Sequence, residues 1–139
     1  MEIDRADVVA EVRDAFVQYE AALVAQDLDA LGKWFWSDPR VVRFGNRELL
    51  YGAEAIAQWR TRMPHVGDDR TLQNTVITAF GPDHAIVATE FFRPGGTTLG
   101  RQSQTWARLP EGWRIVHAHV STVDDGSYER LGEPPTPTA

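Results

Sequence analysis

The chain has 139 residues, which predicts one domain large enough to bury a core without a metal or a disulfide. Because it has no cysteine, the sequence excludes a disulfide scaffold, a zinc ribbon and a cysteine nucleophile, and it fits a cytoplasmic protein. The net charge of −6 disfavours nucleic acid as a partner, and no apolar run has the length of a membrane span or of a signal peptide.

The first half of the chain shows helical periodicity. Apolar residues recur at spacings of three and four between residues 4 and 26, which predicts a long amphipathic helix with Asp4 as its N-cap. Asp27 is the expected cap of a second, shorter helix. Before the break at Pro64 the pattern predicts a short hairpin and a third helix, at residues 41–45, 48–52 and 53–63.

The second half predicts four strands, separated by the turn sequences GPDH, RPGGT and PEG. These strands are residues 71–80, 85–92, 99–109 and 113–123. A long antiparallel meander can curve around the first helix, so we predict a single α+β domain over residues 1–125. Residues 126–139 are rich in Pro and Thr and predict a flexible tail.

The order of these elements resembles the nuclear transport factor 2-like (SnoaL-like) cone. The segments VRFG, YG, TVITAFG, GRQSQTW and LPEGWRIVHAHVS are similar to the AtzH-like family, which includes proteins labelled as oxalurate catabolism protein HpxZ. The similarity runs from about Phe16 to Val123. It implies a small cytoplasmic protein of ureide or s-triazine nitrogen catabolism, and decarboxylating amide hydrolysis of small N-carboxylated ureas as its chemistry.

Arg43 and Tyr19 are the predicted catalytic residues. Arg43 lies mid-strand between apolar neighbours, where burial is costly unless an anion pairs with the guanidinium. Tyr19 lies on the apolar stripe of the first helix and is expected to point its hydroxyl at the concave sheet, as an acid–base group or a hydrogen-bond donor. The resemblance, with its anionic substrate, favours both roles. The alternatives are an arginine that reaches solvent from an edge strand and a core tyrosine bonded to a backbone carbonyl.

Strand alternation predicts which side chains line the cone. Gln102 and Gln104 share a face with Trp106, and the face from Trp113 to His119 grades from apolar to polar. Amide groups carry donors and acceptors together, which suits the alternating C=O and N–H groups of a urea. We therefore predict Gln102, Gln104 and His119 as substrate-binding residues; the alternative places the two glutamines on a solvent-facing side.

Glu90 completes the predicted substrate-binding set as an inward carboxylate. Glu90 and the two histidines of the His-x-His pair that ends at His119 are candidate metal ligands. Only the histidine pair is convincing, and a working site needs at least three ligands. We predict no metal and no other cofactor. Without a cysteine, a GxSxG elbow or an amidase-type Ser–Ser–Lys pattern, catalysis would rest on electrostatics, with Arg43 neutralising a carboxylate and Tyr19 moving a proton.

Three functions fit this sequence. The first is a cofactor-independent enzyme that acts on an anionic ureide, and the second is a non-catalytic binding protein that serves a separate amidase. The third is a ketosteroid-isomerase-like isomerase or a dehydratase, with Glu90 as its base. The Leu, Val and Thr content of residues 71–92 predicts a homodimer through an open sheet face.

Overall fold

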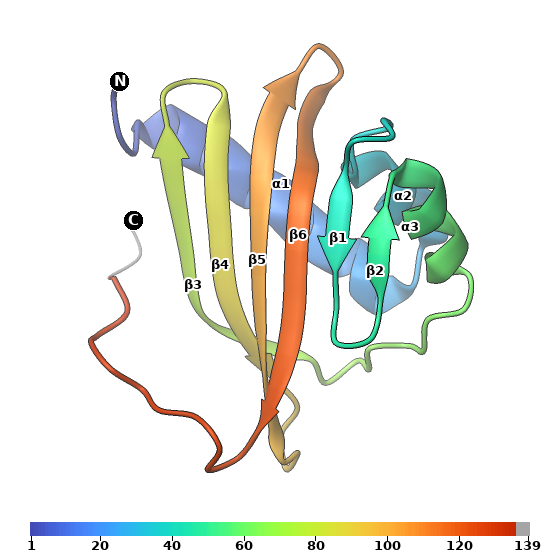
Figure 1. Cartoon of the computed structure of the whole chain (residues 1–139). Helices are drawn as coiled ribbons and strands as arrows, with labels where there is room; N and C mark the ends of the chain where they lie inside the picture. Colours follow the sequence, from blue (N-terminus) through green and yellow to red (C-terminus); the bar gives the residue numbers. More distant parts are fainter. Residues whose placement is uncertain (136–139) are drawn as a thin grey trace.

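The computed structural model describes residues 1–135, in which helices pack against one curved sheet (Figure 1). The helices are α1 (Ala6–Ala25), α2 (Leu28–Trp34) and α3 (Ala53–Arg60). The strands are β1 (Val42–Phe44), β2 (Leu49–Tyr51), β3 (Thr71–Phe80), β4 (His84–Phe92), β5 (Thr98–Leu109) and β6 (Gly112–Asp124). They form one sheet in the order β2-β1-β6-β5-β4-β3, in which β1 runs parallel to β6 and the other neighbours are antiparallel.

The predicted α+β fold is confirmed. Helix α1 crosses one face of the sheet, and the short helices α2 and α3 lie beside β1 and β2 (Figure 1). The one departure from an antiparallel meander is the β1–β6 pair, through which the short hairpin joins the sheet. None of the helices in residues 1–135 combines the length and apolarity that crossing a bilayer requires.

The helix ends follow local side-chain chemistry. Asp27 caps α2 as predicted, because its side chain accepts a hydrogen bond from Ala30 N at 3.1 Å. The prediction that Asp4 caps α1 is wrong. Asp4 takes a positive φ of 56°, and its carboxylate accepts from Ala79 N at 2.8 Å, so it fastens the start of the chain to β3.

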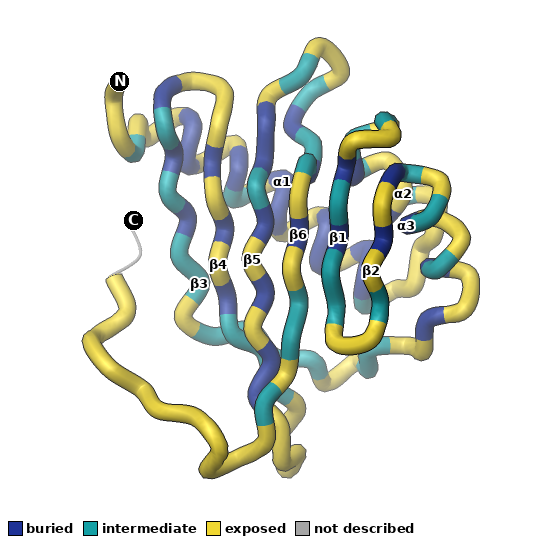
Figure 2. Tube along the Cα trace, in the orientation of Figure 1, coloured by how far each residue is buried: buried dark blue, intermediate teal, exposed yellow. Residues whose placement is uncertain are grey.

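The core lies between α1 and the concave face of the sheet. Along β4 and β5 buried and exposed positions alternate, as one packed face and one open face require (Figure 2). Trp106 and Ile115 are wholly buried there, against the stripe of α1 that carries Val8 and Val12. The stripe continues to Phe16 and beyond, so the predicted helical period sets the packed face.

A bulge divides β6 into two parts. The pairing with β5 shifts between Thr105 and Trp106, and Val116 is the extra residue on β6. The concave side therefore carries Ile115 before the bulge and Ala118 after it, three residues apart and not two. Every position beyond the bulge faces the opposite way from the one that strict alternation predicts.

The chain after β6 returns past the end of the sheet towards β3 (Figure 1). Arg130 in this segment forms an ion pair with Glu90 of β4 at 2.7 Å. Of the predicted tail, residues 136–139 lie outside the described residues.

The first prediction concerns Gly100, which pairs with Phe91 across β4 and β5. A Cβ at Gly100 would overlap the Phe91 ring, which the Arg70 guanidinium covers at 4.0 Å. We expect Gly100→Ala to lower the free energy of unfolding by about 1–3 kcal/mol, because the ring must shift within packed surroundings. Urea unfolding followed by circular dichroism measures this change.

Gly32→Ala is the matched control, since a Cβ at Gly32 in α2 meets nothing within 4 Å. We expect it to raise the free energy of unfolding, by up to about 1 kcal/mol, because alanine favours a helix over glycine. Equal losses in the two variants would contradict the close packing of Phe91 on Gly100.

Candidate functional site

A cavity of about 420 Å³ lies between α1, α3 and the concave face of the sheet. Its volume falls within the roughly 300–1,000 Å³ range of small-molecule sites. Its polar walls come from elements far apart in the sequence: Tyr19 on α1, Arg43 on β1, Arg60 on α3, Arg70 before β3 and Gln102 on β5. The fold therefore gathers three buried guanidinium groups around one small cavity, which the exposed Arg93 also borders.

Arg43 points into the cone, as predicted, and is only 7% exposed. Its Nη1 donates to Glu48 Oε1 at 3.0 Å, and its guanidinium carbon lies 4.4 Å from the centroid of the Trp59 ring. Burial, and then the charge of nearby Arg60, lower the pKa of Arg43 from its ordinary value. This burial excludes the alternative in which Arg43 reaches solvent. A catalytic role for Arg43 stays a prediction.

Tyr19 also faces the cavity, and its partner there is a side chain. The Tyr19 hydroxyl oxygen accepts a hydrogen bond from Arg60 Nη2 at 3.1 Å, while the ring packs edge-on against Phe35. The alternative of a core tyrosine bonded to a backbone carbonyl does not match this arrangement. A catalytic role for Tyr19 likewise stays a prediction.

Arg60 is a site residue that the sequence analysis missed. It is 4% exposed, and no carboxylate in residues 1–135 lies within ion-pair distance of it. Its Nη1 meets only the Met63 sulfur at 3.5 Å, and its buried Nε has no hydrogen-bond partner within the described residues. An unsatisfied buried donor costs about 1–3 kcal/mol, so Arg60 is expensive for the fold. The sequence carries one signal for its position: Arg60 follows Ile56 by four residues on α3, so the two share the buried face of the helix.

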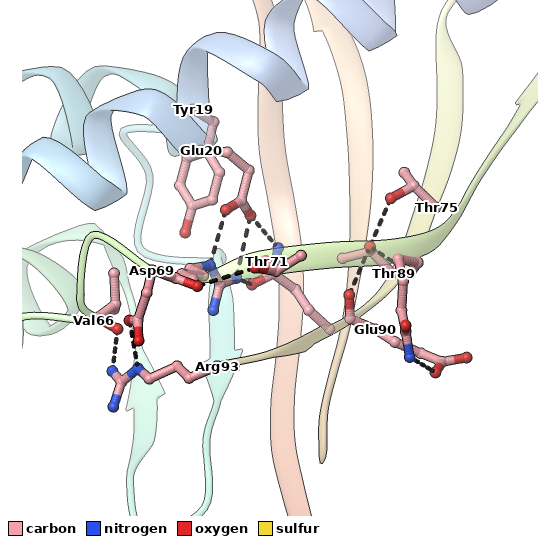
Figure 3. Close-up of polar contacts among 12 residues, drawn as sticks. Tyr19, Glu20, Val66, Asp69, Thr71, Thr75, Thr89, Glu90 and Arg93 are labelled. Atoms are coloured by element: carbon pink, nitrogen blue, oxygen red, sulfur yellow. Dashed lines mark hydrogen bonds and ion pairs between the residues drawn. The ribbon is translucent and has the colours of Figure 1, made fainter. Parts of the chain in front are cut away.

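Glu20, Arg70 and Gln102 form a closed polar cluster beside Tyr19. Arg70 Nε donates to Glu20 Oε2 at 3.0 Å, and Gln102 Nε2 donates to Glu20 Oε1 at 2.9 Å. Arg70 Nη2 also reaches Gln102 Oε1 at 3.2 Å. Figure 3 shows Tyr19 and Glu20 projecting from neighbouring positions of α1, with the contacts of Glu20 drawn as dashed lines. Gln102 thus lines the cavity as expected, Arg70 is an additional lining residue, and Glu20 holds both side chains from behind the wall.

Gln104 faces inward but lies in the core and not on the cavity. It is 2% exposed, and its Oε1 accepts a hydrogen bond from Trp106 Nε1 at 3.0 Å. Its inward direction agrees with strand alternation. Its predicted contact with a substrate does not match this position, because the cavity wall ends at Gln102 on the same strand.

The prediction that His119 lines the cone is wrong. His119 follows the bulge at Val116, so its ring lies on the convex face, 6.1 Å from the Phe44 ring. Ala118 and Val120 take the concave side in its place. His119 instead lines a separate hollow of about 570 Å³ on the convex face.

Glu90 is also outside the cone, in contrast to its prediction as an inward carboxylate. On β4 the buried side chain is that of Thr89, and Glu90 faces the convex hollow, where it accepts from Arg130, Gln73 and Asn74. Chiefly through its hydrogen bonds with Arg130, this setting lowers the pKa of Glu90 from 4.5 to about 2. The isomerase or dehydratase alternative therefore loses its proposed base.

The arrangement as a whole favours an anion. Three buried guanidinium groups meet two carboxylates, since Glu48 pairs with Arg43 and Glu20 pairs with Arg70, which leaves Arg60 without a counter-ion in residues 1–135. No cluster of three or more His, Asp or Glu side chains suited to a metal ion occurs in that part of the chain. A small carboxylate would supply the missing negative charge.

The curved sheet around α1, with this cavity at its open end, is the cone of the nuclear transport factor 2-like class. The chain belongs to the AtzH-like family, whose model matches residues 1–126. The assignment by resemblance is therefore confirmed. No curated protein matches the chain.

Solved structures agree with this assignment. A cystatin-like fold protein from Burkholderia xenovorans LB400 is 50% identical, with a TM-score of 0.86 over 89% of this chain and 98% of that one. A protein of unknown function of the DUF3225 family from Pectobacterium atrosepticum SCRI1043 is 51% identical, with a TM-score of 0.84 over 88% and 95%. A nuclear transport factor 2-like superfamily protein from Salmonella enterica serovar Typhimurium LT2 is 26% identical, with a TM-score of 0.69 over 91% and 99%.

The second prediction concerns the ion pair of Glu90 with Arg130. Because folding lowers the pKa of Glu90, the pair stabilises the fold above about pH 4.5, and this stabilisation is lost as the pH falls through about 2. We expect Arg130→Gln to lower the urea midpoint at pH 7 and to flatten its decline between about pH 5 and pH 2. Urea unfolding at a series of pH values tests both effects.

Arg47→Gln is the control, since Arg47 lies exposed in the turn between β1 and β2, across the sheet from β4. It should leave the pH dependence unchanged. If the urea midpoint of Arg130→Gln falls with pH as steeply as that of the native protein, Glu90 does not pair with Arg130 in solution.

Proposed function

We propose that the cavity binds a small N-carboxylated urea and cleaves the bond between its nitrogen and its carboxyl carbon, with release of CO₂ and without a cofactor. The observation that carries this proposal is the uncompensated guanidinium of Arg60 in a cavity that also exposes Arg43 and Tyr19. Membership of the AtzH-like family supports the substrate class. The small volume of the cavity suits a ureide.

The reaction can proceed without a covalent nucleophile. When the C–N bond breaks, its electron pair remains on the nitrogen and spreads onto the adjacent urea carbonyl, CO₂ leaves, and the nitrogen gains a proton. Arg43 would hold a carboxylate of the substrate, and the Tyr19 hydroxyl would donate to the carbonyl oxygen where negative charge develops. This route suits a chain without cysteine.

A second candidate is a binding protein that delivers the same anion to a separate amidase. One observation favours it: the carboxylates that contact the buried arginines of the cavity, Glu20 and Glu48, are each ion-paired to an arginine. Neither is therefore free to act as a base. The two candidates share the anion site and differ only in turnover.

The cytoplasmic location and the homodimer predicted from the sequence remain part of this proposal. The convex face is the sheet surface that a second copy would cover. Sedimentation velocity on the purified protein would establish its oligomeric state.

The third prediction is that Arg43→Gln and Tyr19→Phe each reduce CO₂ release from N-carboxylated ureas by at least about 100-fold, the scale on which a proton donor or an oxyanion donor contributes. Arg43→Gln should also raise KM, because it removes the charge that holds the substrate carboxylate. The assay gives purified protein a panel of carboxylated ureas and biurets and follows CO₂ and ammonia separately.

Arg47→Gln is the matched control, because Arg47 lies exposed in the turn after β1. Glu90→Gln and His119→Ala should also retain activity within about 2-fold, since both side chains lie outside the cone. No turnover by the native protein, together with binding that Arg43→Gln abolishes, would replace the enzyme with the binding protein.

A further inference from the structure

The hydrogen bond between Arg60 and Tyr19 sets the direction of a proton. Every polar group of a guanidinium is a donor, so the oxygen of Tyr19 must be the acceptor in the 3.1 Å contact with Arg60 Nη2. The single proton of the phenol then has to point elsewhere. Both residues line the same cavity, so the proton is available for donation to a ligand bound there.

The surroundings fix Arg60 in this position. Its guanidinium carbon lies 5.3 Å from the centroid of the Phe35 ring and 5.7 Å from that of Trp59, and its Nη1 touches the Met63 sulfur. Aromatic rings and a thioether hold the guanidinium plane without neutralising its charge. The tyrosine hydroxyl is therefore the only oxygen that accepts a hydrogen bond from Arg60 within residues 1–135.

The neighbouring arginines are arranged differently. Arg43 and Arg70 each donate to a carboxylate, as a structural buried arginine normally does. Arg60 instead has a buried Nε without a partner in the described part of the chain. A side chain that the fold alone required would not need to be charged at this position, because an apolar chain of similar length would avoid the cost of its burial.

We propose that Arg60 is a positioning residue, which turns the Tyr19 hydroxyl proton towards the bound ligand and keeps a positive charge beside the tyrosine oxygen while that proton moves. The inference rests on the proposed C–N cleavage for its chemical step, whereas the orienting of the hydroxyl does not depend on turnover.

The proton balance of the step is complete with water alone. The O–H bond of Tyr19 breaks as its proton passes to the urea group, and the C–N bond breaks with its electron pair going to the nitrogen. CO₂ leaves, and the phenolate oxygen faces the Arg60 guanidinium. A water molecule then returns a proton to Tyr19, and the hydroxide that remains combines with the released CO₂ to give bicarbonate, so no oxidant, reductant or further reactant is required.

The test is a double-mutant cycle on kcat with Arg60→Met, Tyr19→Phe and the double variant. We expect Arg60→Met to lower kcat by at least about 10-fold through the proton donor, and to raise KM as well, because it removes the uncompensated positive charge of the cavity. The cycle is therefore read on kcat. The double variant should be no slower than Tyr19→Phe alone. Arg60→Lys should recover part of kcat, and Arg62→Gln, an exposed site two residues along, should match the native protein.

Stability gives a readout that separates this role from a structural one. We expect Arg60→Met to fold with an unchanged or higher thermal midpoint while kcat falls, since the variant removes a buried charge without a counter-ion. A lower midpoint, or kcat losses that multiply in the double variant, would overturn the proposal. Should Arg60→Met not fold, that result itself contradicts it, and the cycle with Arg60→Lys checks the coupling.

Malonamate, in which a CH₂ group replaces the N–H of a carboxylated urea, tests the orientation without turnover. Titration calorimetry of the same four proteins should show that Arg60→Met weakens binding more when Tyr19 is intact than when the Tyr19→Phe substitution is also present. If this coupling is found in a protein that releases no CO₂ from any substrate, the proposed reaction is wrong but the positioning role of Arg60 is supported. Additive losses of affinity would refute that role even in an active enzyme.

Discussion

The need to compensate buried positive charge shapes this cone. Removing a guanidinium group from water is costly unless acceptors surround it, and three such groups border a single small cavity. Arg43 meets the requirement with Glu48 and the face of Trp59, and Arg70 meets it with Glu20 and Gln102. These contacts tie α1, α3 and the β1–β2 hairpin to the walls of the cavity.

The bulge at Val116 decides what the cavity can contain. Without it, the imidazole of His119 would enter the cone at the level where Ala118 and Val120 now lie. With it, small side chains border the space, and the histidine moves to the convex face beside Phe44. One extra residue in β6 thus leaves the arginines, and not a histidine, as the dominant polar groups of the cavity.

Regular patterns explain which parts could be predicted from the sequence. Helical spacing predicts Tyr19 on the inward side, and the alternation of apolar and polar residues along β4 is consistent with Glu90 on the outer side. A bulge adds one residue without any change in composition, so nothing in the sequence of β6 distinguishes Val116 from its neighbours. Arg60 and Arg70 look like ordinary surface charges in one dimension. They become a site only when α1, α3 and the chain before β3 meet, which is a property of tertiary packing.

The two faces of the sheet illustrate how stability and function are separated here. On the convex face, Glu90 receives hydrogen bonds from three side chains, and its charge is compensated by Arg130. On the concave side, Arg60 of α3 keeps a donor without a partner and a charge without a carboxylate in the described chain. A fold selected only for stability would remove such a group, because an apolar replacement is cheaper. The unpaired guanidinium destabilises the ligand-free protein. An anionic ligand removes this destabilisation by pairing with the charge, and the free energy gained in this way contributes to its affinity.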